Sequence, residues 1–392
     1  MWKKLFGIIT LTSSIVFAEE ALQELEQGDI DFSALLYQQI GLSTVGNIIL
    51  SPFSVLVVLG LTLFGAKGDT AVELSQGLHL PNSQEKIKDA FKSLLPKLKG
   101  NQYFSLSSAN KIYIKNGYTI NPDFLKLAED VFETDLESIN FSDTSKAANT
   151  INKWVESKTN GKIKNFIEAS ALDPLTRLML INAIYFKGNW TSQFPSQATR
   201  KRKFYKYGKQ EIEVDTMFQS SNFKFSDNKE LDAKFLQIPY KGSDIIFTIA
   251  VPNQQNGLGA LEQKLPQVLR QQNYSTTKVN LYLPKFRINS SFKLIPALEK
   301  LGIKKVFSRE ADLSGLLTNK EPLTVSTVLQ KAFINVTESG TEAAAVTGVG
   351  VAPTSIIIPD NGVNLRVDRP FFYSISYKNF PIFVGRVVSP EI

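Results

Sequence analysis

The chain has 392 residues, 43% of them hydrophobic, and a formal net charge of +7. It contains no cysteine, which excludes disulfides, thiolate catalysis and cysteine metal sites. The mild basic excess is not by itself the signature of a nucleic-acid-binding protein, and no Pro/Gly/Ser-rich linker divides the chain.

Residues 1–18 have the pattern of a secretory signal peptide. Two lysines precede the apolar run 5–17, and Val16-x-Ala18 fits a cleavage site. The apolar run is too short to span a bilayer, and no later segment approaches the roughly 20 apolar residues that a span requires. We therefore expect a secreted, extracellular protein without a membrane segment, whose mature part, 19–392, is one domain.

The rest of the chain alternates between helical and strand periodicity. Ser51 and Pro52 have the composition of a helix start, and the apolar segment 53–64 should be a core helix. Further helices are predicted over 29–40, 69–77, 85–99, 121–132, 147–158, 258–270 and 291–301. Strands are predicted over 105–114, 136–141, 177–187, 278–288, 324–336, 371–377 and 382–388. This mixture of helices and antiparallel-style strands implies an α+β fold.

The segment 338–355 is rich in Ala, Gly and Thr, and it follows the predicted buried strand 324–336. Read with a period of two, one set of its residues has no charge and nothing larger than Val. That face could therefore enter a packed core. A surface loop, or a short helix with Thr341 as its N-cap, is the alternative that the pattern leaves open.

One motif in this segment resembles the hinge of inhibitory serpins, a family of serine protease inhibitors. It consists of Glu338, Gly340, Thr341, Glu342, Ala343, Ala344 and Ala345. Other segments similar to serpin motifs, in the family's order, are 51–54, 152–163, 182–190, 311–315, 367–372 and 383–390. The resemblance covers nearly the whole mature chain. It implies a serpin fold of three β-sheets, about eight or nine helices and an exposed reactive-centre loop over about 338–360.

The resemblance also implies a scissile bond and a mechanism. Counting along the family's loop from Gly340 places the bond between Thr354 and Ser355, with cleavage after Val351 or Ala352 as the alternative. Thr354 is small and β-branched, so elastase-like enzymes are the first expected target class. The extracellular protease would be trapped as a covalent acyl complex while the loop inserts into a sheet. A papain-like cysteine protease as target, and a non-inhibitory serpin used for binding, remain the alternatives.

The family places a hydrogen-bonded cluster under the central strands of its main sheet, and the matching positions here are Ser51, Ser54, Asn182 and Gln330. Many members carry His at the position of Gln330. Gln also donates and accepts hydrogen bonds, but it does not titrate, so no pH response is expected there. Ordinary helix capping explains Ser51 and Ser54 equally well. Trp190 resembles the tryptophan at the point where the loop enters the sheet.

Five Asn-x-Ser/Thr sequons are present, and three of them are candidate N-glycosylation sites. Asn189 and Asn335 adjoin strands that should be buried, so the candidates are Asn140, Asn273 and Asn289.

Two basic groups could bind polyanions weakly. One group comprises Lys86, Lys88, Lys92, Lys97 and Lys99, and the other is 200–203 with Lys206. The first group does not form one clean stripe, so a solvated helix face is the simpler explanation.

Signals for catalysis are weak. The only histidine, His79, lies between two leucines, and the chain has no Gly-x-Ser-x-Gly elbow, zinc motif or phosphate-binding loop. We therefore expect a monomeric protein that is not an enzyme, has no metal or cofactor, and binds neither nucleic acid nor membrane.

Overall fold

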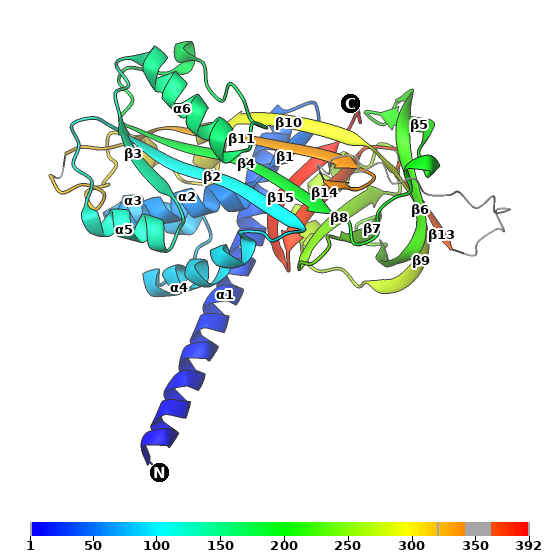
Figure 1. Cartoon of the computed structure of the whole chain (residues 1–392), viewed down its shortest axis with the longest axis horizontal. Coiled ribbons are helices and arrows are strands. Elements are labelled where there is room, and N and C mark those ends of the chain that lie inside the picture. Colours follow the sequence, from blue (N-terminus) through cyan, green and yellow to red (C-terminus); the bar gives the residue numbers. More distant parts are fainter. Residues whose placement is uncertain (1, 320, 342–361, 391–392) are drawn as a thin grey trace.

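The computed structural model describes residues 2–319, 321–341 and 362–390 of the chain (Figure 1). Its helices are α1 (Trp2–Ser43), α2 (Pro52–Gly65), α3 (Gly68–Gly77), α4 (Gln84–Leu94), α5 (Pro122–Asp130), α6 (Thr144–Lys158), α7 (Leu258–Glu262), α8 (Leu265–Leu269) and α9 (Ile295–Lys300). Its first seven strands are β1 (Ile48–Leu50), β2 (Phe104–Lys115), β3 (Asp135–Ile139), β4 (Leu178–Asn189), β5 (Arg200–Lys206), β6 (Gln210–Asn228) and β7 (Ala233–Pro239). The others are β8 (Ile245–Pro252), β9 (Ser275–Pro284), β10 (Phe286–Lys293), β11 (Val325–Thr337), β12 (Gly340–Thr341), β13 (Val363–Arg366), β14 (Phe371–Tyr377) and β15 (Phe380–Val387).

The predicted α+β class is confirmed, and the described part contains nine α-helices. One sheet has six strands in the order β10-β11-β12-β4-β2-β3. The other described strands form a single sheet of nine, ordered β1-β15-β14-β8-β7-β6-β9-β13 with β5 attached to β6. Hydrogen bonding thus connects the expected three sheets into two. The reason is that β6, which is 19 residues long, pairs in turn with β5, β9 and β7.

The strand β4 is apolar along most of its length because both faces of the six-stranded sheet are buried. Leu180 and Ile184 belong to the main core, which includes α2. Ile181 and Tyr185 belong to a second core, formed with α6 and the segment that follows it. Figure 1 shows α2 and α6 on opposite sides of this sheet. The alternation of side chains along one strand therefore divides the sheet between two cores.

The start of α2 follows the sequence prediction closely. The Ser51 hydroxyl accepts from the Ser54 backbone N–H at 3.4 Å, and Pro52 occupies the first turn, where it needs no donor. Nearly every residue of α2 is buried, and the helix contacts β2, β4 and β15. This packing places the Ser51 end of α2 directly under the central strands.

Several predicted helix boundaries are wrong. The segment 258–270 is two short helices, α7 and α8, because Pro266 lacks the N–H that a continuous helix would need there. The segment 85–99 leaves the α-helix at Leu94, next to Pro96. The helix expected over 291–301 begins only at Ile295, because 291–293 continue β10 and pair with β11. Similarly, the strand expected over 278–288 is divided between β9 and β10.

The helix predicted over 29–40 is part of the longer helix α1, which begins at Trp2. Figure 1 shows the N-terminal half of α1 projecting away from the rest of the chain. Midway along α1, Glu20 and Glu24 bind Lys86 of α4 at 3.1 and 2.5 Å. Within the described residues, no helix is both long enough and apolar enough to cross a membrane.

Candidate functional site

The centre of the six-stranded sheet is the seam between two parallel strands, β4 and β11. They pair from Leu178 opposite Val325 to Tyr185 opposite Phe333. Beyond this point β12 lies between them. It pairs with Gly188 and Asn189 of β4 on one side and with the end of β11 on the other, and both pairings are antiparallel. The predicted hinge thus begins inside the sheet, at one end of the seam.

Gly340 is required where the chain turns into this seam. Its φ is +154°, and a Cβ on it would lie 2.0 Å from the Gly188 carbonyl oxygen. Any larger residue would collide with the backbone of β4, so the close approach itself selects glycine.

Thr341, the next residue, is fully buried. Its hydroxyl lies 2.5 Å from the Tyr240 hydroxyl, and the Tyr240 ring stacks on Trp190 with centroids 4.5 Å apart. Trp190 also donates from its indole nitrogen to the Thr337 carbonyl at 3.0 Å and from its backbone to the Ser339 carbonyl at 3.1 Å. Trp190 therefore lies where the chain enters the sheet. Tyr240, which the sequence did not indicate, completes the contact.

Glu338 fixes the chain just before this point. Its carboxylate accepts from the Thr199 hydroxyl at 2.8 Å and pairs with Lys285 at 3.1 Å. Its backbone carbonyl accepts from the Phe194 N–H at 2.9 Å. Burial acts to raise the pKa of Glu338, but the hydrogen bonds to the carboxylate and the charge of Lys285 outweigh burial, so the pKa is lowered. Glu338 is thus held ionised at neutral pH.

The structure brings Ser51, Ser54, Asn182 and Gln330 together beneath the seam, and all four are buried. The Gln330 amide donates to the Asn182 side-chain oxygen and to the Ser51 carbonyl, both at 2.7 Å, and its oxygen accepts from the Ser51 N–H at 2.8 Å. The Ser54 hydroxyl donates to the same Asn182 oxygen at 2.7 Å. Because Asn182 and Gln330 are register partners, the cluster links β4, β11 and the start of α2.

Asn110 of β2 extends this cluster and was missed from the sequence. The Asn182 amide donates to the Asn110 side-chain oxygen, and the two residues are register partners. The alternation of side chains along β2 could have indicated it, because Asn110 lies on the same face of the strand as Ile112 and Ile114. Both isoleucines belong to the main core. A buried polar residue on an apolar face needs a partner.

Six of the predicted site residues lie outside the described residues. They are Glu342, Ala343, Ala344, Ala345, Thr354 and Ser355.

The sequons and basic groups lie on the surface. Asn140, Asn273 and Asn289 are exposed, whereas Asn189 and Asn335 are half-buried. Both predicted basic groups are partly neutralised, because acidic side chains pair with some of their lysines. The pairs are Lys86 with Glu20 and Glu24, Lys99 with Glu133, Lys201 with Asp215 and Lys203 with Glu211.

Residues 27–390 match the family model described as Serpin (serine protease inhibitor). The chain belongs to the serpin family. It is 37% identical to alaserpin of Manduca sexta over 98% of each chain. It is 35% identical to the leukocyte elastase inhibitor of Bos taurus over 88% of this chain and 93% of the relative. Its structure matches that of Serpin48, a highly specific serpin of the insect Tenebrio molitor, with a TM-score of 0.87 and 38% identity over 94% of this chain and 99% of the other.

We predict that Gln330→Leu lowers the free energy of unfolding by about 2 kcal/mol, because the Ser51 N–H and the Asn182 oxygen lose buried partners. Gln219→Leu is the matched control, since Gln219 is also buried but its bonds with Ser192 are long, at 3.4 and 3.5 Å. It should lower the same free energy by less than about 1 kcal/mol. Urea denaturation of the three proteins measures both values. Equal losses in the two variants would contradict a special contribution of the cluster.

We also predict that Glu338→Gln lowers the melting temperature at pH 7 but not in acid. The folded-state pKa of Glu338 is lowered, so its stabilisation is present above the ordinary pKa of a glutamate and is lost as the pH falls through the folded value. The two melting curves should therefore converge as the pH falls through the folded-state pKa of Glu338. Glu310→Gln serves as the control, because Glu310 is exposed and lies 4.0 Å from Lys305. A difference in melting temperature that does not narrow as the pH is lowered would argue against this role of the Glu338 carboxylate.

Proposed function

We propose that the chain is a secreted inhibitor of extracellular serine proteases and acts as a suicide substrate, not as an enzyme. The observation that carries this proposal is the position of β12, which lies antiparallel between β4 and β11 at one end of their seam. A strand that continued from Thr341 in this direction would replace one parallel ladder by two antiparallel ladders. Such an insertion would add backbone hydrogen bonds and bury small side chains.

The chemistry belongs to the protease. Its serine hydroxyl attacks the Thr354 carbonyl, an ester forms, and the bond to Ser355 breaks with release of the new amino terminus. An extended strand from Gly340 to Thr354 spans about 46 Å, so insertion would carry the attached enzyme along the sheet. Distortion of its active site then prevents hydrolysis of the ester, and the covalent complex persists.

We assign the buried cluster to the opening of the seam. The bond from the Gln330 amide to the Asn182 oxygen joins the side chains of the two strands that must separate. Ser51 and Ser54, at the start of α2 and outside the sheet, already bind these two amides. Both amides can therefore keep a partner when the bond between the strands breaks.

An elastase-like enzyme is the favoured target. Thr354 suits a small pocket, and one relative, matched over 93% of its length, is named a leukocyte elastase inhibitor. A papain-like cysteine protease, which also forms acyl-enzymes, is the cross-class alternative. A non-inhibitory role in binding is the other alternative, and the small residues of the hinge argue against it.

We further propose that residues 1–18 are a leader removed on secretion and that the mature protein is a monomer. The projection of the N-terminal half of α1 away from the fold supports removal without damage to the core (Figure 1). Exposure of Asn140, Asn273 and Asn289 supports their use as glycosylation sites in a secreted protein.

Incubation with a panel of elastase-, trypsin-, chymotrypsin- and papain-like proteases tests the function. We expect a complex stable to denaturing electrophoresis with an elastase-like enzyme, and mass spectrometry should locate the cut between Thr354 and Ser355. A complex with the papain-like enzyme alone would establish the cross-class alternative. Cleavage by every protease without any complex would exclude inhibition.

We predict that Thr341→Arg converts the inhibitor into a substrate. The threonine is fully buried against Tyr240, so an arginine would hold the hinge out of the seam and slow insertion. The bond should still be cut, but the covalent complex should fall to about a tenth of wild type or less. Thr191→Arg is the matched control, because Thr191 is exposed one residue after Trp190. If Thr341→Arg traps the enzyme as well as Thr191→Arg does, the hinge assignment is wrong.

A further inference from the structure

A basic groove lies on the face of the six-stranded sheet that is covered by α6. It has a volume of about 640 Å³ and lies between β10, β11 and residues 161–164, the first part of the segment 161–167 that follows α6. Four cations line it, namely Lys162 and Lys164 of the segment, Arg287 of β10 and Lys331 of β11. Among the described residues that line the groove there is no aspartate or glutamate. The described lining of the groove therefore carries positive side chains and no negative one.

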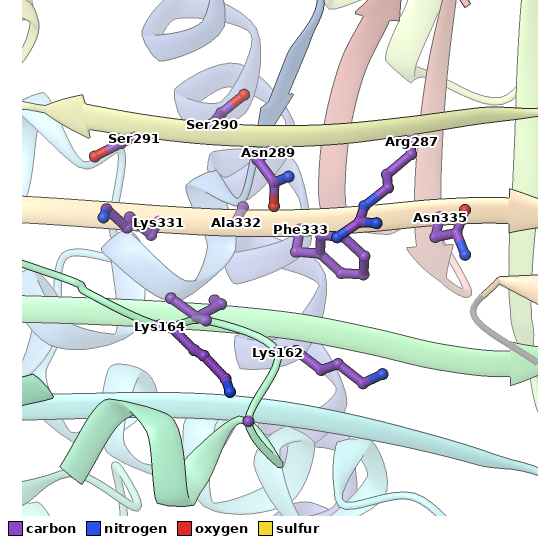
Figure 2. A pocket seen from close by; sticks show the side chains of 12 residues that line it. Lys162, Lys164, Arg287, Asn289, Ser290, Ser291, Lys331, Ala332, Phe333 and Asn335 are labelled. Carbon is purple, nitrogen blue, oxygen red and sulfur yellow. The ribbon is translucent and has the colours of Figure 1, made fainter. Parts of the chain in front are cut away.

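The cations approach the groove from two sides. Figure 2 shows Arg287 extending from β10 over β11, and Lys162 lying over β4 on the opposite side. The Arg287 guanidinium lies 5.1 Å from the centre of the Phe333 ring, which restrains it. Lys331 donates to the Asn165 carbonyl at 2.7 Å, and Lys164 pairs with Glu156 at 3.4 Å outside the groove. Asn289 and Ser291 add polar groups along β10.

We propose that this groove binds an oligo-anion that carries at least two sulfate or phosphate groups. The planar guanidinium of Arg287 suits the paired oxygens of one such group. Lys162, on the opposite side, suits a second group on the same molecule. The volume is within the range of small-molecule sites, and Ser291 supplies a hydroxyl group to a ligand lying along β10.

The bound ligand would also affect the inhibitor, a consequence that rests on the proposed function. The segment 161–167 covers the seam, since Ile163 and Phe166 pack in the same core as Tyr185 and Phe333. A ligand held by both Lys162 and Arg287 would tie this segment to β10 and β11. Separation of β4 from β11 would then be slower, and a larger share of the inhibitor would be cleaved without trapping the enzyme.

Binding is tested on the full chain, with Asn289 unmodified, by fluorescence anisotropy. The two probes are a labelled heparin-derived hexasaccharide and a labelled linear polyphosphate of similar length. The variant Lys162→Ser/Arg287→Ser removes one cation from each side of the groove. The matched control Lys88→Ser/Lys92→Ser removes the same charge from exposed positions of α4, within one of the basic groups predicted from the sequence.

We expect the groove variant to bind about tenfold more weakly and the α4 variant to bind within about twofold of wild type. A preference for the hexasaccharide or for polyphosphate shows which class of anion the groove accepts better, provided that the groove variant loses that binding. Loss of binding only in the α4 variant, equal binding by all three proteins, or no binding by wild type would overturn the proposal. Thermal melts must first show that both variants fold as wild type does.

The inhibition assay is repeated with saturating oligo-anion. We expect wild type to yield less covalent complex and more cleaved inhibitor, and the groove variant to be unaffected. If the ligand binds in the groove but the yield of covalent complex stays the same, the proposed effect on inhibition is wrong, whereas the proposed binding site is still supported. If no protease is trapped with or without ligand, the proposed function fails, whereas the binding result still decides the groove.

Discussion

The seam between β4 and β11 is the constraint on which the rest of the fold depends. Two parallel strands meet in the middle of a sheet that is buried on both faces, so neither can shift alone without exposing a core. The polar exceptions beneath the seam, Asn182 and Gln330, are partners in the same register. Their hydrogen bonds satisfy groups that would otherwise destabilise the fold by about 1–3 kcal/mol each.

The polar cluster beneath the seam fixes the register of β4 and β11 and still allows the two strands to separate. An apolar side chain at position 330 would pack against its neighbours regardless of the register, whereas the Gln330 amide is satisfied only opposite Asn182 and Ser51. The same two groups also bond to Ser51 and Ser54 at the start of α2, so each keeps a partner if the strands separate. These hydrogen bonds therefore define the register of the two strands at this point.

The end of the seam is organised differently. Gly340 allows the closest approach to β4, and Thr341 contacts Tyr240, which stacks on Trp190. Burial raises the pKa of Tyr240 far above its ordinary value, so its hydroxyl keeps its proton at any physiological pH. Glu338 is the only one of these contacts that depends on a charge able to titrate in acid. The beginning of the hinge is thus fixed in register before any insertion takes place.

The sequence predicted the parts of this arrangement that rest on local pattern. The Ser51 cap, the apolar run of β4 and the small residues after Glu338 were all visible, and the family resemblance placed Gln330 and Trp190. Tyr240 was not predictable, because it lies about 100 residues before Thr341 and its own surroundings show no pattern. The split of 258–270 into two helices was not predicted, although Pro266, which lies in the first turn of α8, was the signal for it. Contacts made across the fold, rather than along the chain, account for most of the misses.

The basic groove was also not predictable from local sequence pattern, because its charges come from distant parts of the chain. Lysines close together in the sequence, as on α4, attract attention as a basic group, but Lys86 and Lys99 are paired with acids in the fold. Lys162, Arg287 and Lys331 are far apart in the sequence and converge only because the segment after α6 crosses β4 and reaches β11. That crossing is also what covers the seam. Any widening of the seam must disturb the contacts of Ile163 and Phe166, so an anion that held this segment in place would oppose the widening.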